Sequence, residues 1–278
     1  MSIFYAVILG ILQGLSEFIP ISSTAHLTIA GKAMGIISAD HPEHWTAFIA
    51  VIQLGTLAAV LIYFAKDIRA ILIAFFSQNF GSKKLKYSDQ NIDSKLGWYV
   101  ILGSIPIMTI GLGLKKIIEG SLTKELHIIA YSLIGLAVFL ALADRTAKLN
   151  KDMDKTTWLD ALIVGLAQCL ALIPGASRSG TTITAGLFLG MKRETAARFS
   201  FLLSIPAVFG SGLLEFYQSL KYINSGDLLN MIIATFAAAV SGYFAIAFLL
   251  NFLKTRSTMV FVAYHIILGV IVLWFLAR

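Results

Sequence analysis

Six long apolar stretches constrain the fold of this chain more than any other feature of its sequence. None of them contains Asp, Glu, Lys or Arg. A helix of about 20 apolar residues crosses the hydrocarbon core of a bilayer. We therefore expect six membrane-spanning helices, at approximately Thr46–Ala65, Gly97–Leu114, Leu126–Ala143, Phe199–Leu214, Leu228–Leu250 and Ser257–Ala277.

Composition agrees with a protein that lipid surrounds. Hydrophobic residues make up 58% of the chain and charged residues only 13%, whereas a soluble domain carries roughly 25% charged residues. The fold expected is an all-α integral membrane protein, with one membrane domain over residues 1–278. The net charge of +7 does not indicate nucleic acid as a partner, because Lys and Arg lie between the apolar stretches, where they set membrane topology.

Two further apolar regions, residues 3–35 and 159–191, differ from the six spans. The first is broken by Ile19–Thr24 and the second by Ile173–Thr182, segments rich in proline, glycine and hydroxyl groups. The arms on either side, about 12–17 residues, are short for a full crossing. We interpret each region as a re-entrant helical hairpin whose tip reaches the membrane interior, where protein or water must satisfy irregular backbone.

The chain has the pattern of two inverted repeats. Gly10–Gln13 resembles Gly165–Gln168, and each hairpin precedes three spanning stretches. An odd number of crossings inverts the second half, so the halves are placed at about 1–150 and 151–278. Such repeats bring a site close to the membrane midplane between the halves. The sequence similarity is short, and chance resemblance stays open as the alternative.

The distribution of positive charge predicts the orientation. The loops 66–96, 144–158, 191–198 and 251–256 hold 15 of the 22 Lys and Arg residues. The positive-inside rule makes these loops cytoplasmic. Both termini and the mouth of the first hairpin then face outward. The opposite side holds Lys32, Lys115, Lys116, Lys124, Lys221 and Arg278.

The first hairpin carries the residue types of a phosphoryl-transfer site. Gln13 and Glu17 are four residues apart and share a helix face. An acid within the membrane is a functional candidate because burying its charge is costly; a merely solvated interfacial position is the alternative. Ser22 and Ser23 can cap the second arm, with His26 in its first turn.

The second hairpin supplies an anion-binding pattern. Arg178 lies in an apolar context beside glycines and the hydroxyl groups of Ser177, Ser179 and Thr182. A helix N-terminus offers N–H groups to an anion, and a guanidinium can grip phosphate with two donors. Gly175 and Gly180, two glycines in this cluster, would let backbone approach a ligand closely. The alternative is an ordinary capping loop with Arg178 at the surface.

These segments resemble the undecaprenyl pyrophosphate phosphatase family of the bacitracin-resistance type. Gln13–Pro20 matches the family motif (E/Q)xxxE, and Ser22–His26 follows it. Pro174–Thr182 matches the motif PGxSRSxxT. The resemblance covers essentially the whole chain. It implies hydrolysis of undecaprenyl pyrophosphate to undecaprenyl phosphate and inorganic phosphate at the outer face of the bacterial cytoplasmic membrane, which recycles the lipid carrier for cell-wall synthesis.

A hypothesis for the mechanism gives roles to individual residues. Ser23 would attack the terminal phosphorus, with His26 as general base and Glu17 either orienting His26 or holding Mg²⁺ (or Ca²⁺). Many family members have glutamate at the position of Gln13, so any divalent cation would depend mainly on Glu17. The residues expected to bind substrate are Arg178, Gln13, Ser22, Ser177, Ser179 and Thr182. A rival assignment makes His26 the nucleophile.

Other interpretations stay open at this point. Inverted repeats and broken helices are also typical of transporters, so a lipid flippase is the main alternative, possible as a second activity. The expected partners are undecaprenyl pyrophosphate and membrane lipid, and a homodimer is one possible assembly. His127 and His265 lie in plain apolar spans and receive no role, and Cys169 is interpreted as an apolar filler.

Overall fold

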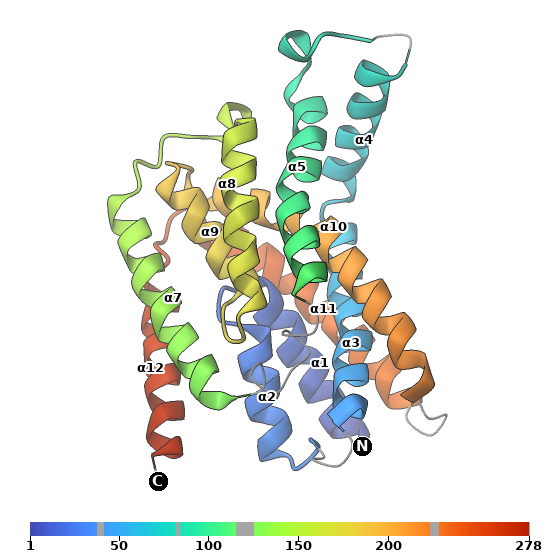
Figure 1. Cartoon of the computed structure of the whole chain (residues 1–278), viewed down its shortest axis with the longest axis vertical. Helices are drawn as coiled ribbons and strands as arrows, with labels where there is room; N and C mark the ends of the chain where they lie inside the picture. The colour runs from blue at the N-terminus through green and yellow to red at the C-terminus, as the bar shows by residue number, and fades with distance from the viewer. Residues whose placement is uncertain (38–41, 82–83, 115–124, 223–227, 278) are drawn as a thin grey trace.

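The computed structural model describes residues 1–37, 42–81, 84–114, 125–222 and 228–277. Eleven α-helices and four short 3₁₀ turns form the protein in these ranges (Figure 1). The helices are α1 (Ile3–Phe18), α2 (Ser23–Ala33), α3 (Pro42–Tyr63), α4 (Ala65–Asn79), α5 (Ile92–Gly113), α7 (Leu126–Thr146), α8 (Trp158–Gln168), α9 (Arg178–Phe188), α10 (Arg193–Ser219), α11 (Leu228–Leu253) and α12 (Met259–Leu276). The 3₁₀ turns are η1 (Tyr87–Asp89), η3 (Met153–Lys155), η4 (Cys169–Leu172) and η5 (Leu220–Tyr222).

The six expected spanning helices are confirmed as α3, α5, α7, α10, α11 and α12, each long and apolar enough to cross a bilayer. The largest difference is in α10, which begins at Arg193 rather than near Phe199. Its first two turns are charged, and a hydropathy pattern detects only the apolar part of a helix that starts in water. Pro106 and Pro206 lie inside α5 and α10, which continue through them.

Both interrupted regions are helical hairpins. In the first, α1 and α2 are separated by Ile19–Ser22; in the second, α8 and η4 are separated from α9 by the segment 173–177. The breaks need backbone that a helix cannot supply: Ser22 has a φ of 73° and Gly175 a φ of 87°. The two tips lie near the middle of the bundle, approached from opposite ends (Figure 1).

The segment after α3 corrects one expectation. We interpreted residues 66–96 as a loop, but most of the first half is the helix α4. Together with the start of α5, it projects beyond the bundle (Figure 1). The two helices pack through Phe75, whose ring meets Trp98 at 5.0 Å between centroids and fills the space left by Gly97. The start of this helix carries Lys66, Asp67 and Arg69, charges that are also typical of a loop, so its amphipathic pattern was not recognised as a helix.

Helices of each half pack against helices of the other half. The helix α1 packs chiefly on α11, whereas α8 packs chiefly on α5; α3 contacts α10, and α7 contacts α12. Each hairpin thus lays its first helix on the middle span of the other half. Two inverted halves would produce this pairing; the division near residue 150 stays a prediction.

Ion pairs gather the four loops that we placed on one side of the membrane. Asp67 binds Arg198 at 2.6 Å, and Arg193 binds Asp144 at 2.5 Å. Lys192 binds Asp152 at 2.8 Å, a second link to the 144–158 loop, and Lys254 of the 251–256 loop binds Glu194 at 3.9 Å. The grouping of these loops at one end is therefore confirmed. Of the charges counted on the other side, Lys115, Lys116, Lys124 and Arg278 lie outside the described residues.

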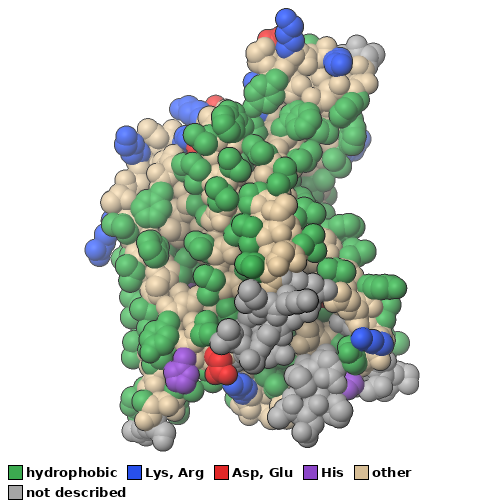
Figure 2. Space-filling model, viewed as in Figure 1, with side chains coloured by type: hydrophobic (Ala, Val, Ile, Leu, Met, Phe, Trp, Pro, Cys, Tyr) green, Lys and Arg blue, Asp and Glu red, His purple; other side chains and the backbone are tan. Residues whose placement is uncertain are grey.

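The surface carries the belt expected of a membrane protein. Figure 2 shows hydrophobic side chains over the middle of one face, with Lys, Arg, Asp and Glu toward its ends and margins. Large side chains such as Phe139, Phe236 and Phe244 are 60–70% exposed on spanning helices. Lipid tails solvate such side chains, which would be costly to expose to water.

The close contact between α1 and α11 generates a stability prediction. A Cβ atom at Gly10 would meet the carbonyl oxygen of Ala234 and would lie 2.8 Å from the Cβ of Ala237. Overpacking of this kind costs about 1–3 kcal/mol, so Gly10→Ala should lower the melting temperature of the detergent-solubilised protein. Gly135→Ala is the control, because no atom lies within 4 Å of the added Cβ. Equal melting temperatures for the two variants would contradict the packing described.

Candidate active site

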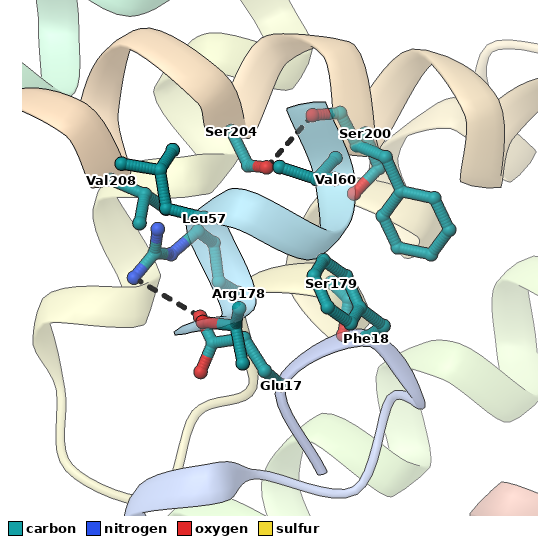
Figure 3. A pocket seen from close by; sticks show the side chains of 11 residues that line it. Glu17, Phe18, Leu57, Val60, Arg178, Ser179, Ser200, Ser204 and Val208 are labelled. Carbon is teal, nitrogen blue, oxygen red and sulfur yellow. Dashed lines mark hydrogen bonds and ion pairs between the residues drawn. The ribbon is translucent and has the colours of Figure 1, made fainter. Parts of the chain in front are cut away.

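An ion pair joins the tips of the two hairpins. The Nη2 atom of Arg178 lies 3.5 Å from Oε1 of Glu17, and these side chains are 23% and 10% exposed. Glu17 stands in the last turn of α1, and Arg178 is the first residue of α9. Figure 3 shows the guanidinium pointing toward the carboxylate beside a segment of α3. The structure therefore brings together the two charges that the sequence placed 161 positions apart.

The second carboxylate oxygen of Glu17 accepts hydrogen bonds from two side chains of its own hairpin. The Ser23 hydroxyl donates to Oε2 at 2.7 Å, and the Gln13 amide donates to it at 3.2 Å. The turn at Ile19–Ser22 folds α2 back so that Ser23, six residues after Glu17, reaches it. Glu17 thus accepts a hydrogen bond from the Ser23 hydroxyl, a potential nucleophile, and forms an ion pair with the Arg178 guanidinium at the same time.

Two buried polar atoms at this site have no hydrogen-bond partner among the described residues. They are Nη1 of Arg178 and Oε1 of Gln13. Leaving such groups unpaired costs about 1–3 kcal/mol each, and a ligand oxygen or an ordered water would satisfy the guanidinium donor. Because Arg178 also lines the pocket, its unpaired donor marks a place where a polar ligand would bind.

The start of α9 adds hydroxyl and backbone donors. Ser177 caps the helix by accepting from the backbone N–H of Gly180 at 3.1 Å, and its hydroxyl lies 3.0 Å from that of Ser179. The positive end of the helix dipole points at the site and favours an anion there. Ser177 and Ser179 are both buried, and Ser179 also lines the pocket beside Arg178.

Two spanning helices complete the pocket. The residues that they contribute to it were not among those expected from the sequence. Thr56 of α3 and Ser200 and Ser204 of α10 supply hydroxyl groups. The apolar part of the wall consists of Phe18, Leu57, Val60, Phe201 and Val208 (Figure 3). The spacing of Ser200 and Ser204, one helical turn apart in an apolar span, was the available signal.

His26 lies in a different contact from the one we expected. Its Nδ1 atom is 2.7 Å from the carbonyl oxygen of Ser22, and its Nε2 atom is 2.5 Å from the hydroxyl of Tyr264. In the described part of the chain, no hydrogen bond connects the imidazole to Ser23 or Glu17. The role of His26 as general base for Ser23 stays a prediction.

Ser22 and Thr182 use their hydroxyl groups within the protein. Ser22 caps α2 by accepting from the N–H of Ala25 at 3.3 Å, which confirms the expected cap. Thr182 donates to the carbonyl of Arg178 at 2.7 Å and lies 2.5 Å from the Ser200 hydroxyl. Both residues shape the helix ends that carry Ser23 and Arg178; substrate contact by either stays a prediction.

The two glycines of the second motif face protein rather than an open ligand site. A Cβ at Gly175 would lie 2.6 Å from the carbonyl oxygen of Ile129, and one at Gly180 would lie 2.7 Å from Leu136. We expected these glycines to let a ligand approach closely, and the structure shows that they let helix α7 approach closely instead. The second hairpin is therefore held close to this span.

The donor set for a metal ion is small. Among residues 1–37, 42–81, 84–114, 125–222 and 228–277, no three His, Cys, Asp or Glu side chains gather as a metal site would require. Glu17 and the unpartnered Oε1 of Gln13 are hard oxygen donors of the kind Mg²⁺ takes. Mg²⁺ commonly binds through one or two carboxylates together with substrate phosphates, so these residues fit a cation that the substrate helps to hold.

Comparison with known proteins gives matches over nearly the whole chain. The family model described as "Bacitracin resistance protein BacA" matches residues 6–271. The chain is 60% identical to an undecaprenyl-diphosphatase of Syntrophobacter fumaroxidans, over 100% of this chain and 99% of the relative. It is 50% identical to an undecaprenyl-diphosphatase of Chloroherpeton thalassium, covering 98% and 96%, and 49% identical to that of Chlorobaculum tepidum, covering 97% and 95%.

Proposed function

This chain belongs to the bacitracin resistance protein BacA family, and we propose that its undecaprenyl-diphosphatase reaction takes place at the Glu17–Arg178 pair. The reaction adds water to undecaprenyl diphosphate and yields undecaprenyl phosphate and inorganic phosphate. The observation that carries the assignment is the buried, unpartnered Nη1 donor of Arg178, with a serine that is hydrogen-bonded to the carboxylate of Glu17.

Arg178 and the N-terminus of α9 bind the diphosphate in this proposal. The unpartnered Nη1 donor and the first N–H groups of the helix meet phosphate oxygens, and the hydroxyl of Ser179 adds a donor. These groups are fixed before the substrate arrives, so they stabilise charge on the transferring phosphoryl group without reorganising. The apolar wall on α3 and α10, next to this polar end, suits the first units of a lipid chain.

Ser23 is the nucleophile in this proposal, and Glu17 is its first proton acceptor. The 2.7 Å hydrogen bond from the Ser23 hydroxyl to Oε2 supports this pairing over the imidazole. A serine hydroxyl needs such a neighbour to attack. As Oγ bonds to the terminal phosphorus, its proton passes to Glu17 and undecaprenyl phosphate leaves. Water then hydrolyses the phosphoserine and releases inorganic phosphate, with His26 available to accept a proton.

A divalent cation, Mg²⁺ or Ca²⁺, belongs to the proposal as well. Glu17 and the Gln13 carbonyl oxygen would hold it together with the diphosphate. When bound, the cation neutralises charge on the phosphate oxygens. Glu17 would then accept from Ser23 and help to hold the cation, and Arg178 would bind the substrate.

We place the site on the outer face of the bacterial cytoplasmic membrane. The four loops that hold most Lys and Arg lie together at the end opposite the mouth of the first hairpin, and the positive-inside rule favours the cytoplasm for that end. Lipid transport stays a second hypothesis. The exchanged packing of the two halves supports it, although transport alone needs no nucleophile.

Replacing either charge should abolish activity but leave the protein folded. In Arg178→Ala and Glu17→Ala, phosphate release from a C55 or C15 diphosphate should fall by at least about 100-fold, the usual loss for a single transition-state contact. Arg256→Ala, on the loop between α11 and α12, is the control and should keep wild-type activity. Full activity in either site variant, with normal insertion, would remove the proposed site.

A trapped phospho-enzyme would identify the nucleophile. With a substrate labelled on its terminal phosphate, rapid acid quenching should leave label on Ser23, stable to acid and labile to alkali. Ser23→Ala should lose this label. Label that is instead acid-labile, alkali-stable and absent from His26→Ala would assign the attack to the imidazole and reject the Ser23 mechanism.

Removal of metal tests the cation. Treatment with EDTA should abolish phosphate release, and Mg²⁺ or Ca²⁺ should restore it. Gln13→Glu, which adds a second carboxylate, should lower the Mg²⁺ concentration needed for half-maximal activity by about tenfold, since each unit charge strengthens binding of a hard cation. Activity that persists without any divalent cation would reject this part of the proposal.

A further inference from the structure

Tyr264 of α12 lies against His26 of the first hairpin. The two rings are nearly parallel, with an interplanar angle of 10° and 5.6 Å between centroids. The tyrosine hydroxyl is 2.5 Å from Nε2 of His26. These residues are 238 positions apart in the chain, so the contact joins the last spanning helix to the helix that carries Ser23.

The surroundings of His26 determine which atom donates in this contact. The carbonyl oxygen of Ser22, 2.7 Å from Nδ1, can only accept. In the neutral ring, Nδ1 therefore carries the proton and Nε2 presents its lone pair. The Tyr264 hydroxyl then donates to Nε2, and both ring nitrogens of His26 have partners.

The elements that carry Tyr264 and His26 are packed together tightly. Ala25, next to His26, lies in a buried cluster with Ile129 and Leu133 of α7, against which Leu268 of α12 packs. Helix α12 approaches α7 closely at Gly269, where a Cβ would lie 2.7 Å from the side chain of Ile134. The position of the tyrosine hydroxyl relative to His26 is therefore set by spanning helices and not by a loop.

We propose that Tyr264 is a positioning residue for the phosphatase reaction, which holds His26 through Nε2 in both of its protonation states. The inference rests on the proposed function, in which His26 takes part. While the imidazole is neutral, the hydroxyl donates to Nε2. When a proton is released during hydrolysis, it bonds to the hydroxyl oxygen of Tyr264 while the hydroxyl's own proton passes to Nε2, because that hydroxyl occupies the lone pair of Nε2. One O–H bond forms, one O–H bond breaks and one N–H bond forms, so Tyr264 stays neutral and its oxygen then accepts from Nε2–H.

This arrangement has a consequence for catalysis. A hydroxyl can exchange the roles of donor and acceptor at one oxygen atom, whereas a carboxylate can only accept and a methyl group can do neither. His26 can therefore change its charge without losing a partner or turning its ring. Loss of the hydroxyl leaves Nε2 unpaired and the ring held only through Nδ1 and by stacking.

A double-mutant cycle tests the proposal. Tyr264→Phe keeps the aromatic ring and removes only the hydroxyl, so its kcat for phosphate release should fall about tenfold, the effect of one hydrogen bond of roughly average strength. KM should change less than about twofold, because Tyr264 does not contact the substrate. In a His26→Ala background, Tyr264→Phe should have no further effect. Tyr131→Phe, on the exposed face of α7, is the matched control and should be unchanged.

Each other outcome has a definite meaning. Wild-type kcat in Tyr264→Phe, or an equal loss with and without His26, would overturn the positioning role. Wild-type activity in His26→Ala would instead reject the part of the proposed function assigned to His26.

A spectroscopic readout covers the case in which His26→Ala is too slow to measure. In protein labelled with ¹⁵N-histidine, Tyr264→Phe should shift the Nε2 signal of His26, and Tyr131→Phe should not. An unmoved Nε2 signal in Tyr264→Phe would overturn the proposal.

Discussion

The structure depends on pairing two charges inside the membrane. A carboxylate or a guanidinium alone in hydrocarbon is costly, and breaking a buried pair leaves the remaining charge uncompensated. Glu17 and Arg178 come from separate hairpins, so their pairing requires that both tips reach one place. The same requirement explains the two breaks. Each places a helix end at the tip of its hairpin, so that Glu17 at the end of α1 and Arg178 at the start of α9 lie beside each other.

The bundle around this pair satisfies the exposed backbone of the breaks. Ser22 and Ser177 cap the helices that begin at each tip, and α7 lies directly against Gly175 and Gly180. On the other hairpin, Tyr264 of α12 binds the first turn of α2 through His26. Thus α7 and α12, which pack on each other, each support the hairpin of the opposite half. These contacts fix a polar site inside the bundle, while the outer surface of the bundle stays apolar and faces lipid.

Much of this was predictable from sequence because the relevant signals are local. Spans follow from runs of apolar residues, and Glu17, Ser23 and Arg178 stand out as polar groups in short motifs. The helix α4 was missed because its charges resemble those of a loop. The pocket wall on α10 and the contact of Tyr264 depend on how distant helices are rotated against each other, and the partner of Ser23 depends on the turn that folds α2 back onto α1. A Tyr or Ser in an apolar span carries no local sign of the face to which it turns.

The most direct test is a structure determined with a non-hydrolysable lipid diphosphonate, in which a methylene group replaces the bridging oxygen. Our account predicts a phosphonate oxygen within hydrogen-bond distance of Nη1 of Arg178, with the terminal phosphorus facing the hydroxyl of Ser23. The lipid chain should leave along the apolar wall of α3 and α10. A diphosphonate bound away from the hairpin tips, with the Glu17–Arg178 pair unchanged, would contradict the account.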